Sequence, residues 1–237
     1  MNNYKDKVLG GLFGKNIGGT LGGPYEGNTS YLHLIYYSPV PTEPLPNDDF
    51  ELQLVWLDML KKKGIFFKPA DIAYHWKNHT KYYISEYFMG QRNIALGLVP
   101  PVTGSFNNPW TVGMGCTIRS EIWALMAPGM PDIAAAYAYI DASSDHAGIG
   151  MYGEMFIAAM ESAAFVESDP NKLIDIGLSY IPSDCKVAKL ANFVRDEYNK
   201  GTSEYRLRNM ILADYSHVCD FTYVTANLGF ILLGLLY

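Results

Sequence analysis

The chain has 237 residues, of which 49% are hydrophobic and 14% aromatic, so it can bury a substantial core. Because the composition stays even, without a linker, charge block or repeat, we predict a single domain over residues 1–237. The formal net charge of -6 comes without the basic patch that polyanion binding needs. We therefore expect no nucleic acid polymer as a partner, although a metal ion or helix N-termini could still attract a small phosphorylated ligand.

The cysteines and the apolar runs bear on the cellular setting. Cys116, Cys185 and Cys219 are widely spaced and form no C-x-x-C pair, which favours a reducing, cytoplasmic location. The N-terminus lacks the compact apolar region of a signal peptide. The longest apolar run, residues 226–237, has about 12 residues where about 20 are needed to span a bilayer. We expect it to be a buried helix, and we expect no membrane partner.

The first predicted helix covers residues 5–21 and is rich in glycine. These glycines recur at every fourth residue, at Gly10, Gly14, Gly18 and Gly22. Glycine costs about 1 kcal/mol in a helix interior, so the stripe predicts another backbone or a ligand packed closely against it. The helical pattern breaks in the segment 22–27, which places Glu26 in a turn just past the helix.

The next predicted helix opens on two consecutive carboxylates, Asp48 and Asp49. The apolar residues that follow recur at the spacing of one helix face: Leu52, Val55, Trp56, Met59 and Leu60. Asp48 with Glu51 fits a capping box, which would stabilise the helix start by about 1 kcal/mol without any chemistry. Adjacent acids at a helix N-terminus can also hold a cation. The spacing alone favours capping and leaves the cation site as the alternative.

Helical patterns account for most of the remaining chain. One helical pattern begins at Pro69. It is followed by a Gly/Pro/Asn-rich loop at 100–110, and loops of this length often cover a site. The later patterns cover residues 116–127, 131–143, 150–167, 170–179, 184–199, 203–213 and 225–236. Apart from a short alternation at 31–37, no convincing strand pattern occurs. We therefore predict an all-α, compact multi-helix domain.

Two histidine motifs could carry chemistry. His75 and His79 stand one helical turn apart, a spacing that suits zinc. Because the glutamate of H-E-x-x-H is absent and no third ligand is obvious, an ordinary exposed helix face is favoured there. His146 follows the helix that begins at Pro131, and a helix C-terminus favours a histidine without any function.

Four segments, in the same order, resemble the ADP-ribosylglycohydrolase family. They are the glycine-rich opening at 6–27, Asn47-Asp48-Asp49, Gly115-Cys116-Thr117-Ile118-Arg119, and residues 141–153. The second segment resembles the family's Thr-Asp-Asp metal motif. The third resembles its N-G-x-x-x-R motif and the fourth its T-H-x-x-x-x-x-Y motif. The resemblance extends over nearly the whole chain and implies an all-α hydrolase.

The resemblance also implies a reaction and a set of site residues. Such a hydrolase would use two magnesium ions to cleave the glycosidic bond of an ADP-ribosylated protein or a small ADP-ribose derivative. The implied metal ligands are Asn47, Asp48 and Asp49. The implied catalytic residues are Glu26, Asp48 and Asp49, with Glu26 as the acid/base or water-positioning group. The implied substrate-binding residues are Arg119, Asp145 and His146. Hard oxygen ligands of this kind favour magnesium.

Three departures from the family pattern suggest an alternative. Gly19 stands where many relatives have an aspartate, and Met114 replaces the asparagine of the N-G motif. The family's second metal motif, D-x-D-T, occurs nowhere in these residues, so the ligands of a second magnesium ion are missing from this chain. We expect a C-terminally truncated or naturally shortened member. The alternative is a non-catalytic relative that binds a nucleotide or sugar ligand, or that acts as a structural or interaction protein.

Overall fold

The structure is a computed structural model that describes residues 2–43, 45–217 and 221–237, so Cys219 lies outside the described residues. These residues form twelve α-helices and two 3-10 turns and contain no strand, which confirms the predicted all-α fold. One isolated bridge joins Gly113 to Tyr223. The alternating segment 31–37 is irregular.

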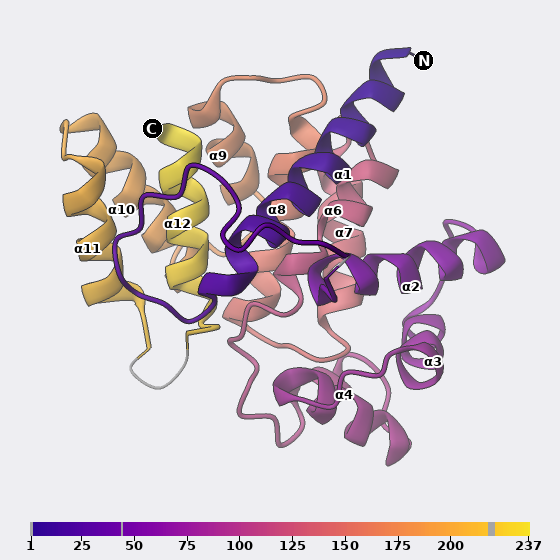
Figure 1. The fold of residues 1–237 in the computed structure, drawn as a ribbon. Helices are drawn as coiled ribbons and strands as arrows, with labels where there is room; N and C mark the ends of the chain where they lie inside the picture. Colours follow the sequence, from indigo (N-terminus) through magenta and orange to yellow (C-terminus); the bar gives the residue numbers. More distant parts are fainter. Residues whose placement is uncertain (1, 44, 218–220) are drawn as a thin grey trace.

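The order of the helices follows the predicted order closely (Figure 1). The N-terminal elements are α1 (Asn2–Gly22), η1 (Gly23–Tyr25), α2 (Asp48–Lys63), α3 (Pro69–His79), α4 (Ser85–Ala95), α5 (Val102–Ser105), η2 (Thr117–Arg119), α6 (Glu121–Met126) and α7 (Pro131–Ala142). The C-terminal elements are α8 (Ile149–Ala163), α9 (Pro170–Leu178), α10 (Lys186–Asn199), α11 (Glu204–Tyr215) and α12 (Val224–Leu236). Among these, α4 and the four-residue α5, which lies within the predicted loop at 100–110, have no counterpart in the predicted set.

Three buried tryptophans hold α2, α3 and α6 together. Trp56, Trp76 and Trp123 come from these three helices, and each side chain is 0% exposed. The rings of Trp56 and Trp76 are stacked with centroids 5.7 Å apart, and Trp123 lies 6.4 Å from Trp56. Aromatic pairs of this kind contribute about 0.5–1.5 kcal/mol beyond the area that they bury. This aromatic cluster therefore fixes the helix whose first turn carries Asp48 and Asp49.

A second hydrophobic cluster joins α8 to the C-terminal helices. Its fully buried members include Phe156, Leu190, Ile211, Leu228 and Leu232. Helix α8 takes part in both clusters, because its Ala158 packs with the tryptophans. Figure 1 shows α8 near the centre, with α2, α3 and α4 on one side and α10, α11 and α12 on the other.

The predicted apolar C-terminal helix is confirmed as α12. Leu228 and Leu232 of this helix are 0% exposed, within the second cluster. In the part of the chain that the structure describes, no helix combines the length and apolar character needed to cross a membrane.

The prediction that another backbone packs closely against the glycine stripe of α1 is wrong. Among the described residues, no neighbouring atom lies within 4 Å of a Cβ built at Gly10, Gly14, Gly18 or Gly22. Helix α1 instead contacts the other helices through long side chains. The Tyr4 hydroxyl donates to the Leu125 carbonyl at 2.9 Å, and Lys7 Nζ donates to the Ala164 carbonyl at 3.1 Å. A period of four identifies a glycine face, but it does not show which face of the helix is covered.

Candidate active site

Helix α2 begins at Asp48 because Asn47 leaves the helical conformation. Asn47 is extended, with φ -152° and ψ 106°, and its carbonyl accepts the backbone N–H of Glu51 at 2.9 Å. The predicted capping box between Asp48 and Glu51 is wrong. Asn47 is the N-cap residue, and the Glu51 carboxylate accepts a short hydrogen bond from the Tyr82 hydroxyl. The Asp48 and Asp49 side chains are thus not used to cap their own helix.

The Asn47 amide is buried next to the two acids. Its Oδ1 has no hydrogen-bond partner among the residues that the structure describes. A Cβ built at Gly19 would lie 2.2 Å from Asn47 Nδ2, so the absence of a side chain at Gly19 makes room for this amide. A buried acceptor without a donor costs about 1–3 kcal/mol. The amide oxygen is therefore a ready ligand for a cation.

The fold changes the protonation of Asp49. Burial raises the pKa of its carboxyl to about 6, Lys15 opposes this, and the charges of Asp48, Glu121 and Glu26 add to it. The structure thus brings Glu26 close enough to influence Asp49, although the Glu26 side chain is exposed in the turn after η1. The site concentrates negative charge that a cation would relieve.

In metal-free buffer, we expect the wild type to lose stability relative to Asp49→Asn as the pH rises from about 4 to about 7. The folded-state pKa of Asp49, about 6, exceeds the ordinary aspartate value of 3.8, so the folded protein binds more protons in this window. A higher pH removes that stabilising contribution. Urea unfolding of both proteins at a series of pH values measures the difference. A difference that is constant with pH would contradict the raised pKa.

Several charged residues of the site were not predicted from the sequence. Lys15 Nζ lies 2.7 Å from Glu121 Oε1 and donates to the Ile118 carbonyl at 2.5 Å. Gln53 Nε2 donates to Glu121 Oε2 at 2.8 Å and to the Asp49 carbonyl at 3.1 Å. One sequence signal was present, since Lys15 is the only charged residue between positions 8 and 25. These contacts connect α1, α2 and α6 around the acids.

A cavity of about 560 Å³ opens beside this network. Its polar lining comes from Lys15, Asp49, Thr117, Glu121 and Glu161, and its apolar lining includes Met114. Burial and the neighbouring Glu121 raise the pKa of Glu161 well above its usual range. A protonated Glu161 and the Lys15–Glu121 pair limit the net negative charge of the cavity, so an anionic ligand meets less repulsion there.

Helix α4 connects the acids to the segment that precedes η2. The Tyr87 hydroxyl lies 3.3 Å from Asp48 Oδ2 and 3.3 Å from the Gly115 carbonyl. Glu86 Oε1 accepts the Gly115 N–H at 3.1 Å. Through these bonds α4 fixes Asp48 relative to the backbone of the segment 113–116.

The predicted substrate-binding residues come together in the interior. Arg119 Nη1 donates to Asp145 Oδ2 at 2.9 Å, and Arg119 Nη2 donates to Asp141 Oδ1 at 2.9 Å. His146 Nδ1 lies 2.8 Å from Asp145 Oδ1. Burial alone would raise the pKa of Asp145, but the charges of Arg119 and His146 outweigh it and bring the value to about 2.

This buried network is separate from the cavity. Arg119 and Asp145 are 0% exposed and His146 is 1% exposed. In the described part of the chain, none of the three lines the 560 Å³ cavity. Their role in binding ADP-ribose stays a prediction, and the contacts in the structure give them a part in stabilising the fold.

The donor set at the start of α2 is suited to a single magnesium ion. Asp48 and Asp49 supply carboxylates and Asn47 supplies the partnerless amide oxygen, and magnesium commonly takes one or two carboxylates and keeps several waters. Glu26 does not complete a three-carboxylate cluster. Within the described ranges, the one set of three His, Cys, Asp or Glu side chains whose ligand atoms all lie within 4.8 Å is Asp58, His75 and His79.

The fold and the site define an all-α protein in which two acids at the start of α2 lie beside a cavity. Comparison with protein families gives a match to the ADP-ribosylglycohydrolase family over residues 1–237, the whole chain. The chain belongs to the ADP-ribosylglycohydrolase family. This family is generally metal-dependent and acts on ADP-ribose-linked substrates. No curated protein and no solved structure matches the chain.

Proposed function

We propose that the protein is a magnesium-dependent hydrolase that cleaves the glycosidic bond of an ADP-ribosylated protein or a small ADP-ribose derivative. The observation that supports this proposal is the buried Asn47 Oδ1, which has no hydrogen-bond partner among the described residues. Asn47 directly precedes Asp48 and Asp49 in a chain that belongs to the ADP-ribosylglycohydrolase family. These three residues would hold the ion. Arg119, Asp145 and His146 remain the candidate substrate-binding residues of the proposal.

Each residue of the site would have a separate role in hydrolysis. When bound, magnesium would act as a Lewis acid that activates water, and it would also coordinate the ribose hydroxyls. Glu26, in the exposed turn near Asp49, would act as the acid/base or water-positioning group. Asp49, with a pKa of about 6, can hold or release a proton near neutral pH. Lys15 would offset the negative charge of the diphosphate in the cavity that it lines.

The test of this proposal is an Asp48→Ala variant assayed for metal binding and turnover. We expect magnesium affinity, measured by calorimetry, to fall by at least about tenfold. We expect a comparable or larger loss in the hydrolysis of ADP-ribosyl-arginine and ADP-ribosyl-serine substrates. Asp132→Ala is the matched control, because Asp132 is an exposed acid in the first turn of α7. Turnover that survives Asp48→Ala unchanged, or the absence of magnesium binding to the wild type, would rule out the catalytic proposal.

A non-catalytic function is the second candidate, and one observation favours it. Lys15 Nζ already supplies a positive charge among the acids, 2.7 Å from Glu121 Oε1, in a chain without the D-x-D-T motif. A protein amine can balance carboxylates without activating water. If the function is binding, calorimetry will show ADP-ribose binding to the wild type, and neither substrate will be hydrolysed at any magnesium concentration.

A further inference from the structure

A cluster of three metal-ligating side chains lies outside the candidate active site. Asp58 comes from the second half of α2, and His75 and His79 come from one face of α3. One ligand atom from each of the three side chains lies within 4.8 Å of the other two. The sequence showed the two histidines one turn apart but no third ligand, because the third ligand belongs to another helix.

We propose that Asp58, His75 and His79 form a zinc site that clamps α2 to α3. Two imidazoles and one carboxylate are a ligand set that zinc uses in proteins, with a fourth position left for water. The ligand atoms of one tetrahedral zinc ion are about 3.3 Å apart. His75 Nδ1 and Asp58 Oδ2 are 3.9 Å apart, so a small side-chain movement would complete the site. Asp58 and His79 are accessible enough to make that movement.

The buried nitrogen of His75 points independently to a ligand. The His75 side chain is 1% exposed, and its Nδ1 has no hydrogen-bond partner within the described ranges. A buried polar atom of this kind destabilises the fold when it is left unsatisfied, and a metal ion would satisfy it. Burial, followed by the neighbouring His79, lowers the pKa of His75, so the imidazole is neutral and its lone pair is available at neutral pH.

One existing contact competes with the metal. Lys62 Nζ lies 2.6 Å from Asp58 Oδ2, and both side chains are well exposed, at 55% and 44%. An exposed pair with i,i+4 spacing is weak, because water screens its charges. A zinc ion can therefore displace Lys62 at small cost.

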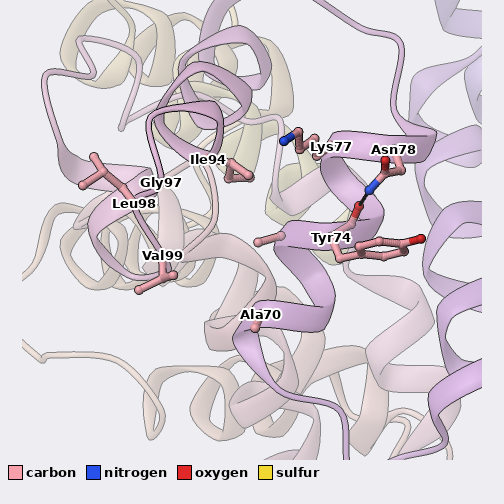
Figure 2. A pocket seen from close by; sticks show the side chains of 9 residues that line it. Ala70, Tyr74, Lys77, Asn78, Ile94, Gly97, Leu98 and Val99 are labelled. Carbon is pink, nitrogen blue, oxygen red and sulfur yellow. Dashed lines mark hydrogen bonds between the residues drawn. The ribbon is translucent and has the colours of Figure 1, made fainter.

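The zinc site is separate from the acids at the start of α2. Asp58 is ten residues beyond Asp48, which is about 15 Å along a helix. It is also separate from the hollow of about 470 Å³ in Figure 2, which Tyr74, Lys77 and Asn78 of α3 line without His75 or His79. Figure 2 shows the Asn78 side chain donating to the Tyr74 carbonyl on that side of the helix. The site would thus hold the far half of α2, while the first turn of the same helix carries the acids.

The test is zinc titration of the EDTA-treated full chain by calorimetry, with cobalt absorption as a report on the coordination geometry. To remove binding at the acids, all proteins carry Asp49→Asn. We expect one zinc ion per chain, a tetrahedral cobalt spectrum, and an affinity that falls by at least about tenfold in His79→Gln and in Asp58→Asn. Lys62→Gln should bind zinc about twofold more tightly.

The control is His33→Gln, since His33 is an exposed histidine in the loop before α2. It should bind zinc as its parent does. Because His79 is exposed, His79→Gln should keep the fold, and circular dichroism checks this. Zinc affinity that is unchanged in both His79→Gln and Asp58→Asn, or that falls equally in His33→Gln, would overturn the proposal.

Discussion

Replacing Arg119 by methionine is expected to lower the free energy of unfolding by about 3–5 kcal/mol. Arg119 is fully buried, and its guanidinium is the cation that pairs with Asp141 and Asp145, both 0% exposed. Without it, Asp141 loses its counter-ion and Asp145 keeps only His146 as a charged partner, so an interior carboxylate must either stay charged or take up a proton. Urea unfolding measures the loss. In a domain of this size each kcal/mol corresponds to about 2–4 °C in the melting temperature, so thermal melts provide a second readout.

Arg195→Met is the matched control for this prediction. Arg195 pairs with Asp175 across the surface between α9 and α10, and the Asp175 side chain is 66% exposed. Exposed pairs contribute about 0–1 kcal/mol, because water screens the charges. Equal losses in the two variants would contradict the view that burial makes the Arg119 network strongly stabilising.

Replacing Trp56 by alanine is expected to cost about 3–5 kcal/mol of unfolding free energy. The ring is 0% exposed and stacks on Trp76, and the Arg119 guanidinium lies 5.9 Å from its centroid. Its removal leaves a large cavity between α2 and α3 that the rigid neighbours cannot fill. Chemical denaturation of the purified variant measures the loss.

Leu54→Ala in the same helix is the control for Trp56→Ala. Leu54 is 51% exposed, so its truncation should change the stability by no more than about 0.5 kcal/mol. If Trp56→Ala costs as little as Leu54→Ala, then the aromatic cluster does not hold α2 in place.

Most helices could be predicted from the sequence because their apolar residues recur at helical spacing. Helix α4 could not, and its buried residues explain why. Its interior face includes Glu86, Gln91 and Asn93, and each of these side chains makes at least one hydrogen bond to a residue outside the helix. A polar face of this kind has no apolar periodicity, so only tertiary contacts define the helix.

The sequence indicates the residues of the candidate site that are adjacent in the chain, and it does not indicate those that are distant. Asn47, Asp48 and Asp49 form a local motif that the sequence shows directly. The pairing of Lys15 with Glu121 spans 106 positions, and the isolated charge of Lys15 in its glycine-rich segment does not indicate which residue pairs with it. Asp58 was missed as a partner of the α3 histidines for the same reason. Spacing within one helix predicts which side chains share a face, whereas contacts between helices depend on packing.

The open glycine face of α1 has a consequence for the acidic site. At about 1 kcal/mol for each uncompensated glycine, α1 has a small free energy of local opening compared with the buried α8. Opening α1 would withdraw Lys15 from Glu121 and Asp49, and the acids would then need another cation. Docking of α1 and cation binding at the acids would therefore be linked equilibria, in which each would alter the free energy of the other.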